Sequence, residues 1–168
     1  MAEQNFLIRP LTLNDRELAM RFFDNLGPAS LQFFNINDIH RNSLIDWFEG
    51  RRPDKRNFVA VGTNEQGEEE IAGYVFLWDV NYKTPWMGIC VSDKWHGHGL
   101  GKKLTAYVED YCRKLGKGGI FLTTDKENIA GQKVYTHCGY KQIGYLEDEL
   151  LYFRFFEDEF PPEDGSVG

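Results

Sequence analysis

The residues most suited to chemistry lie in a short glycine-rich segment near the middle of the chain. Gly97, Gly99 and Gly101 occur within five residues, between an apolar stretch that ends at Val91 and an amphipathic stretch that begins at Leu100. Glycine lets a backbone turn sharply and bring its N–H groups against a ligand. A helix N-terminus adds unpaired donors and a partial positive charge. The pattern predicts a loop that binds phosphate or pyrophosphate, and a glycine-rich turn without a ligand is the alternative.

Two familiar phosphate-binding motifs do not fit this segment. A P-loop has the form G-x-x-x-x-G-K-[ST], but His96 stands at its first glycine and Lys103 at its Ser/Thr position. The dinucleotide fingerprint fails because Lys102 occupies the place of its third glycine. Lys102 and Lys103 still add positive charge beside the loop. The segment therefore indicates an anion-binding loop of another type.

A second segment with spaced functional residues follows about thirty positions later. It runs from Asn128 to Tyr140 and carries Gly131, Tyr135 and Gly139 at fixed intervals. An apolar stretch lies between the two segments, so that the order is strand, loop, helix, strand, helix. Either segment alone is weak evidence for a function, but the two together in this order are strong evidence.

The two segments resemble the GNAT superfamily of N-acyltransferases, and the resemblance covers nearly the whole chain. The loop is similar to the acyl-CoA-binding motif [RQ]-x-x-G-x-[GA]: Gly99 and Gly101 match, whereas His96 replaces Arg or Gln. The second segment is similar to the pattern N-x-x-[AG]-x-x-x-Y-x-x-x-G-[FY]. The resemblance implies an enzyme that uses acetyl-CoA as a cosubstrate and acetylates an amine of a small molecule or peptide. A non-catalytic CoA-binding or protein-interaction module on the same fold is the alternative.

The resemblance also implies roles for individual residues. Tyr135 resembles the general acid that protonates or hydrogen-bonds the departing CoA thiolate, and a phenol with a pKa of about 10 is protonated at neutral pH. A tyrosine that only packs against the sheet is the alternative. Asn128 is expected to bind the pantetheine arm, to cap a helix, or both. The residues expected to bind acetyl-CoA are Ile89, Cys90, Val91, His96, Gly97, His98, Gly99, Leu100, Gly101, Lys102, Asn128 and Tyr135.

The sequence says less about the acceptor amine. Phe33, Asp79 and Tyr82 are expected to line its site, because aromatic faces beside a carboxylate suit a cationic amine; core packing is the alternative for the aromatic residues. Thr123 stands where some relatives carry a glutamate, so the general base is not evident. Asp79 and Asp125 are candidates for it, and a turn acid without a catalytic role is the alternative for each.

Two other kinds of chemistry are less favoured. His96, His98 and His137 have no cysteine or acidic partner at typical zinc spacing, so no metal is expected. Cys138 lies three residues after Tyr135 and could carry an acyl group, although a buried cysteine is the commoner case.

Composition narrows the class of protein further. The 168 residues carry a formal net charge of -7, which argues against nucleic acid as a partner. The cysteines are odd in number and form no C-x-x-C pair, as expected for reduced thiols in a cytoplasmic protein. No signal-peptide pattern or apolar run of membrane-spanning length is present, so no membrane association is expected.

The elements that must position these residues follow from apolar periodicity and turn residues. Strands are expected at about 6–9, 58–61, 71–80, 86–91, 120–123, 140–145 and 150–156, and helices at about 14–26, 43–49, 100–115 and 129–138. Asn14 and Glu17 have the spacing of a capping box for the first helix. The third helix should bury Leu100, Leu104, Val108, Cys112 and Leu115.

This order predicts the α/β (α+β) class with a GNAT-like fold, in which helices flank a central mixed, mostly antiparallel sheet. One parallel strand–helix–strand unit is expected from Trp86 to Thr123. Residues 1–160 are expected to form a single domain, and residues 161–168 a disordered tail. The apolar last strand could serve as a sheet edge that pairs with a second copy, giving a homodimer.

Overall fold

The computed structural model describes residues 5–156. Its strands are β1 (Leu7–Pro10), β2 (Arg56–Thr63), β3 (Glu69–Trp78), β4 (Trp86–Val91), β5 (Gly119–Thr124), β6 (Lys141–Leu146) and β7 (Glu149–Phe155). Its α-helices are α1 (Arg16–Asp24), α2 (Pro28–Leu31), α3 (Ile39–Phe48), α4 (Leu100–Lys114) and α5 (Ile129–His137). Every predicted strand and helix is present, and α2 is an additional short helix that the apolar periodicity does not predict.

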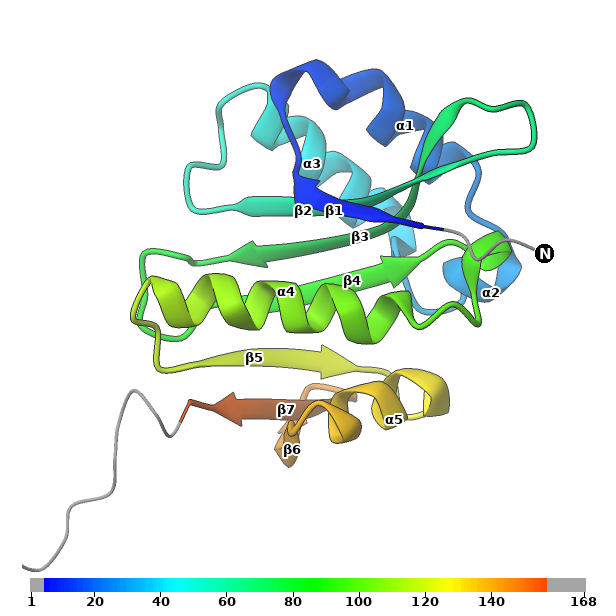
Figure 1. Ribbon diagram of the computed structural model, residues 1–168. Helices are drawn as coiled ribbons and strands as arrows, with labels where there is room; N and C mark the ends of the chain where they lie inside the picture. The colour runs from blue at the N-terminus through cyan, green and yellow to red at the C-terminus, as the bar shows by residue number, and fades with distance from the viewer. Residues whose placement is uncertain (1–4, 157–168) are drawn as a thin grey trace, which may run out of the picture.

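The strands form a single seven-stranded sheet in the order β1-β2-β3-β4-β5-β7-β6 (Figure 1). Every neighbouring pair is antiparallel except β4 and β5, which are parallel and are joined through α4. A parallel pair needs such a crossover because the chain must return to the starting end of the sheet. The predicted fold class and its one parallel unit are therefore confirmed.

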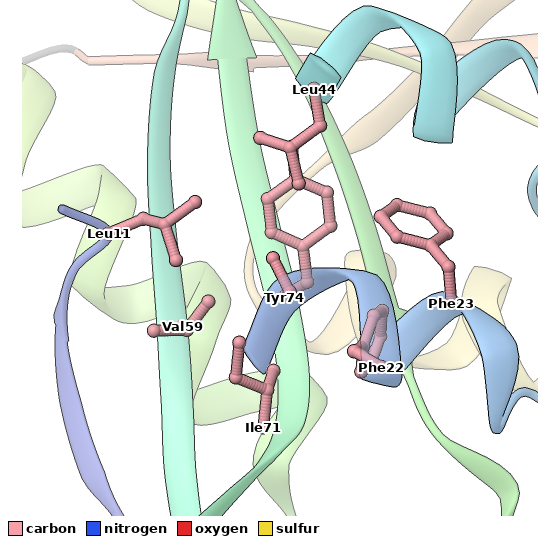
Figure 2. A pocket seen from close by; sticks show the side chains of 8 residues that line it. Leu11, Phe22, Phe23, Leu44, Val59, Ile71 and Tyr74 are labelled. Carbon is pink, nitrogen blue, oxygen red and sulfur yellow. The ribbon is translucent and has the colours of Figure 1, made fainter. Parts of the chain in front are cut away.

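Side chains on the central strands alternate between two cores. In β3, Val75 and Leu77 face the core built with α4 and α5, whereas Tyr74 and Phe76 face the core built with α1 and α3. Figure 2 shows part of this second core, where Phe22 and other side chains of α1, α3, β2 and β3 meet. The space that they enclose is too small for a water molecule, so this region is packed interior and not a ligand site.

Helix α4 carries the apolar stripe that the sequence predicts, with one exception. Leu100, Leu104, Val108 and Cys112 are each at most 1% exposed and pack on the sheet. Leu115 is 53% exposed, because α4 ends at Lys114 and the chain turns away there. The prediction for Leu115 is wrong.

The first helix is capped by other residues than predicted. The carboxylate of Asp15 accepts hydrogen bonds from the backbone N–H of Thr12 at 2.8 Å and from its hydroxyl at 3.0 Å, in a capping box two residues earlier than the expected Asn14–Glu17 pair, at the start of the 3-10 turn Leu13–Asp15 that leads into α1. Arg9 on β1 adds an ion pair to Asp15 at 2.7 Å. A hydrogen bond with Arg9 is the main reason that the pKa of Asp15 falls to about 2.

The last strand does not form a sheet edge. Strand β7 pairs with β5 on one side and with β6 on the other, so its backbone groups are used within the sheet. The edges are β1 and β6. A homodimer that pairs through β7 is therefore excluded, and a homodimer through another surface stays a prediction.

The remaining predictions about organisation are not tested. A single domain over residues 1–160 stays a prediction, and the expected tail at residues 161–168 lies outside the described residues. None of the helices between residues 5 and 156 is long and apolar enough to cross a membrane.

Candidate active site

The candidate site begins where two neighbouring strands separate. Strand β4 pairs with β3 along its whole length, and β5 does so with β7, but β4 and β5 pair only where Trp86 lies opposite Phe121. Beyond that point, toward the carboxyl ends of both strands, the edge of β4 is not covered by β5. A cleft of about 760 Å³ opens there and is lined by the glycine loop, β4, α5 and the α2–α3 segment. Its volume is that of a typical small-molecule site.

The glycine loop has a conformation that side chains disfavour. Gly97 and Gly99 have φ values of 86° and 73°, and a Cβ atom on either would meet nothing within 4 Å. Glycine is therefore needed there for its backbone freedom, and the space beside the loop is open. Gly99 precedes α4, where Lys103 donates the first backbone hydrogen bond back to the Gly99 carbonyl at 3.2 Å. The amides of the first turn, with Lys102 in the cleft lining, present positive potential to an anion.

The two loop histidines have different surroundings. The Nε2 atom of His96 lies 2.7 Å from the carbonyl oxygen of Val91, and His96 lines the cleft. His98 instead packs against the rings of Phe6 and Trp95, with centroids 5.8 and 5.7 Å away, and is not among the lining residues. Of the residues expected to bind acetyl-CoA, His98 alone does not line the cleft.

The loop is also tied to the helices on the acceptor side. Asp93 accepts hydrogen bonds from the backbone N–H groups of Ala29 and Ser30 at 3.0 and 2.9 Å, so it caps the start of α2. The hydroxyl of Ser30 donates to the carbonyl of Val91 at 3.0 Å. The hydrogen bond to Ser30 is the main cause that lowers the pKa of Asp93. This link between residues 64 positions apart left no signal in the sequence.

Asn128 caps the helix that carries the tyrosine. Its Oδ1 atom accepts from the N–H of Gly131 at 3.0 Å, and its Nδ2 atom donates to the hydroxyl of Thr124 at 3.2 Å. A Cβ atom on Gly131 would lie 2.6 Å from that Nδ2 atom, so a small residue is needed there. One of the two predicted roles of Asn128, the helix cap, is confirmed, and contact with the pantetheine arm stays a prediction.

Tyr135 lies where α5 meets the gap in the sheet. It is 8% exposed, lines the cleft, and packs near Tyr140 and Tyr152 at centroid distances of 6.1 and 6.2 Å. Burial, with smaller effects of Cys90 and Cys138, raises its pKa well above the ordinary value. The hydroxyl is therefore protonated at neutral pH, and the influence of Cys90 places it close to β4.

The cysteines near the site are held as thiols. Burial is the main reason that the pKa of Cys90 rises to about 12, and burial also raises the pKa of Cys138. A thiolate is the nucleophilic form, so neither residue is activated for a covalent route. Within residues 5–156, no three or more His, Cys, Asp or Glu side chains are grouped so that they could hold a metal ion.

The acceptor side of the cleft is built largely from residues that the sequence did not single out. Of the three residues predicted for it, Phe33 lines the cleft, whereas Asp79 and Tyr82 lie outside the lining. Lining residues that the sequence did not assign to the acceptor include His40, Trp86 and Glu149. Their types are common in cores and on surfaces, so no local pattern could have identified them.

The fold changes the protonation state of His40. Its ring stacks on Phe34 at 4.4 Å and lies 5.1 Å from Phe76 and 6.2 Å from Trp78. Burial, with the nearby positive charge of Lys55, lowers its pKa to about 4. His40 is therefore neutral at physiological pH and extends an aromatic wall along the cleft.

Comparison with known proteins gives this arrangement a context. Residues 16–140 match the model of the acetyltransferase (GNAT) family. The chain is 29% identical over 111 residues to a streptothricin acetyltransferase of Streptomyces lavendulae, and this match spans 64% of the chain but only 54% of that protein. The chain thus aligns with about half the length of that relative.

Solved structures show the same fold at low sequence identity. A ribosomal-protein-S5-alanine acetyltransferase of Vibrio fischeri superposes with a TM-score of 0.75 at 15% identity, covering 96% of this chain and 98% of that one. A spermidine N-acetyltransferase of Vibrio cholerae, solved with CoA and spermine, superposes with a TM-score of 0.68 at 18% identity, covering 92% of this chain and 97% of that one. Together with the family match over most of its length, these findings show that the chain belongs to the acetyltransferase (GNAT) family.

Proposed function

We propose that the protein transfers the acetyl group of acetyl-CoA to an amine, with the Tyr135 hydroxyl as the acid that serves the departing thiolate. One observation carries this proposal: a single cleft joins the glycine loop, the uncovered edge of β4 and the buried hydroxyl of Tyr135. Family membership supports the reaction class. The amine is expected to belong to a small molecule or a peptide.

The cofactor side of the cleft fits acetyl-CoA. The loop glycines and the first amides of α4 suit the pyrophosphate, and Lys102 adds a countercharge. The backbone of Ile89, Cys90 and Val91 on the β4 edge can pair with the pantetheine amides, as an added strand would. The bound cosubstrate would supply a thioester carbonyl for the amine to attack.

Tyr135 has the chemistry that its proposed role needs. Because its pKa is raised, the hydroxyl holds its proton until sulfur develops negative charge. General acid catalysis of this kind is typically worth about 10²- to 10⁴-fold in rate. Cys90 and Cys138 remain thiols, which favours direct attack by the amine over an acyl-cysteine.

Replacement of one hydroxyl tests the proposal. Y135F is expected to lower kcat about 100-fold or more while the Kd for acetyl-CoA changes less than about twofold. Acetyl-CoA binding is measured by calorimetry, and turnover by thiol release with streptothricin, spermidine and an alanine-terminated peptide, the kinds of acceptor named for the relatives.

A neighbouring tyrosine provides the matched control. Tyr140 is 2% exposed, its ring lies 6.1 Å from that of Tyr135, and among the described residues its hydroxyl has no hydrogen-bond partner. Y140F should therefore keep activity within about twofold. Binding of acetyl-CoA without turnover of any amine by the wild-type protein would support the alternative, a non-catalytic CoA-binding module.

A further inference from the structure

A carboxylate lies next to the position where the sequence lacks one. Thr123 on β5 stands where some relatives carry a glutamate, and its hydroxyl acts to lower the pKa of Glu149, the first residue of β7. Thr123 lies opposite Leu151 in the β5–β7 pair, so Glu149 is two residues along on the same face. Strand β7 thus places the Glu149 carboxylate beside Thr123, where β5 itself carries no carboxylate.

The face of the sheet on which Glu149 lies is the one that an acceptor would use. Phe121 stacks on Trp86 at 4.9 Å and lies 4.6 Å from Phe153. Because side chains alternate along a strand, Thr123 shares the face of Phe121, and Glu149 shares the face of Phe153. Trp86 and Glu149 both line the cleft. An aromatic surface that ends at a carboxylate suits a cationic amine.

The proposed acid lies on the other face of the sheet. Tyr135 belongs to α5 and packs with the core under α4, whereas Trp86 lies opposite Trp78, which packs against the core under α1 and α3. The gap between β4 and β5 connects the two faces. An amine on the side of Glu149 would therefore approach a thioester in the gap from the side opposite Tyr135.

We propose that Glu149 is the catalytic base, which accepts the proton that the attacking amine loses, and that Thr123 positions it. This inference rests on the proposed acetyl transfer. A bound ammonium ion first releases one proton to solvent. The neutral amine nitrogen then forms a bond to the thioester carbonyl carbon, and the C–S bond breaks. The amine proton passes to the Glu149 carboxylate, and the thiolate takes a proton from Tyr135. Exchange with solvent then returns both side chains to their starting states.

The surroundings of Glu149 favour this role. Glu149 is exposed, but partial loss of hydration raises its pKa above the ordinary value of 4.5, and the negative charges of Asp125 and Glu147 raise it further. A carboxylate with a raised pKa is a better proton acceptor. The other titratable side chains that line the cleft are His40, Cys90, His96, Lys102, Asp125 and Tyr135.

Asp125 is held in a different way. Its Oδ1 atom accepts the backbone N–H of Glu127 at 2.8 Å, and its carbonyl accepts the side chain of Gln132 at 3.1 Å. The carboxylate therefore stabilises the turn before α5. Asp125 also lines the cleft. One of its carboxylate oxygens is already used in this turn, which favours Glu149 as the base.

The test compares E149Q with E147Q. Glu147 lies two residues before Glu149 and does not line the cleft, so E147Q removes the same charge outside the site. E149Q should lower kcat about 100-fold for every amine that the wild-type protein acetylates, among spermidine, streptothricin and an alanine-terminated peptide. E147Q should stay within about threefold. The Kd for acetyl-CoA should be unchanged in both variants, which also shows that both are folded.

The pH profile separates a base from a structural residue. Wild-type kcat/KM should fall on the acid side with an apparent pKa above 4.5, because protonation removes the base. Ionisation of the acceptor amine contributes to this limb equally in all variants, so the contribution of Glu149 is the difference between them. That contribution should be absent in E149Q and present in E149D, which should recover part of the activity. T123V should shift the limb to higher pH, since the hydrogen bond from Thr123 lowers the pKa of Glu149.

Each result is decisive. Full activity of E149Q, or loss of activity in D125N with E149Q unaffected, overturns the role of Glu149 and leaves acetyl transfer standing. Equal losses in E149Q and E147Q show a general effect of charge and also overturn it. If the wild-type protein turns over none of the amines, the proposed function fails, and the role of Glu149 fails with it.

Discussion

The two sides of the cleft are built in different ways. The proposed cofactor side comes from one stretch, residues 86–135, and depends largely on local conformation: Gly97 and Gly99 have positive φ values, and the Asn128 side chain caps the N–H of Gly131. The acceptor side joins His40 of α3 to Glu149 of β7, more than 100 positions later in the chain, and depends on side chains. Recognition by backbone tolerates changes of residue type, as at His96, whereas recognition by side chains does not. The acceptor side is therefore where specificity is expected to reside.

The largest effect that we expect concerns Lys55, which packs against Phe76 of the cleft lining. Lys55 is fully buried, with its Nζ atom 4.3 Å from the ring centre of Phe76 and 3.0 Å from the hydroxyl of Ser43. Burial is the main reason that its pKa falls from 10.5 to about 7. Between pH 7 and pH 10.5, Lys55 is protonated more fully in the unfolded chain than in the folded protein. Its contribution to the free energy of unfolding therefore increases with pH, by at most about 1.4 kcal/mol per pH unit.

Substitution by methionine isolates this contribution. The free energy of unfolding of K55M, from urea titrations at pH 7, 8 and 9, should rise less with pH than that of the wild-type protein. Subtracting the free energy of unfolding of K55M from that of the wild-type protein at each pH cancels the effect of thiols and other groups that titrate in this range. Identical slopes would show that Lys55 keeps an ordinary pKa. The Kd for acetyl-CoA should not change, because Lys55 lies outside the cleft lining.

A pair of glycines at the two ends of α4 tests the backbone side. Gly99 and Gly116 have the same φ of 73°, and a Cβ atom on either would meet nothing within 4 Å. Alanine should cost each protein about 1 kcal/mol of stability from backbone strain. Only G99A should also weaken acetyl-CoA binding, by about tenfold, since the loop can then no longer bring its amides as close to the pyrophosphate.

Calorimetry with acetyl-CoA and thermal denaturation measure the two effects separately. Equal affinities for G99A and G116A would remove the loop from the binding site. Equal losses of affinity would mean that backbone strain spreads along α4, and the contrast between the two sides would weaken.

The smallest effect concerns the aromatic face of the acceptor side. W86L should raise the KM for a cationic amine about fivefold, because a ring face contributes on the order of 1 kcal/mol to binding of a cation. F153L is the control, since Phe153 belongs to the same row of rings but does not line the cleft. Both variants are compared by steady-state kinetics at saturating acetyl-CoA. A similar KM for W86L and the wild-type protein would show that the amine does not contact this ring.

Local patterns made most of the fold predictable. The period of apolar residues located every predicted strand and helix, and β4 (Trp86–Val91) matched the expected range at both ends. The errors lie where a tertiary contact competes with a local signal. The pair Asn14 and Glu17 has capping-box spacing, but Asp15 forms the box because Arg9 on β1 also binds it.

The same rule separates the predictable from the unpredictable residues of the site. The glycine loop and the segment from Asn128 to Tyr135 are recognisable because their chemistry needs particular residues at fixed spacing along one stretch. Glu149 carries no such signal: a glutamate after a turn is most often a solvated surface residue. Its proposed role arises only because the register of β7 places it beside Thr123.

The sequence by itself therefore determined the order of elements, the family resemblance and the conformation of the glycine loop and the Asn128 cap, because helix and strand periods, glycine conformations and caps are local properties. Tertiary structure alone decided that β4 and β5 separate beyond Trp86, that β7 lies inside the sheet, and that His40 is half-buried and neutral. Strand order and burial depend on contacts between residues far apart in the chain. The charge and position of the acceptor-side groups follow from those contacts, and no local pattern encodes them.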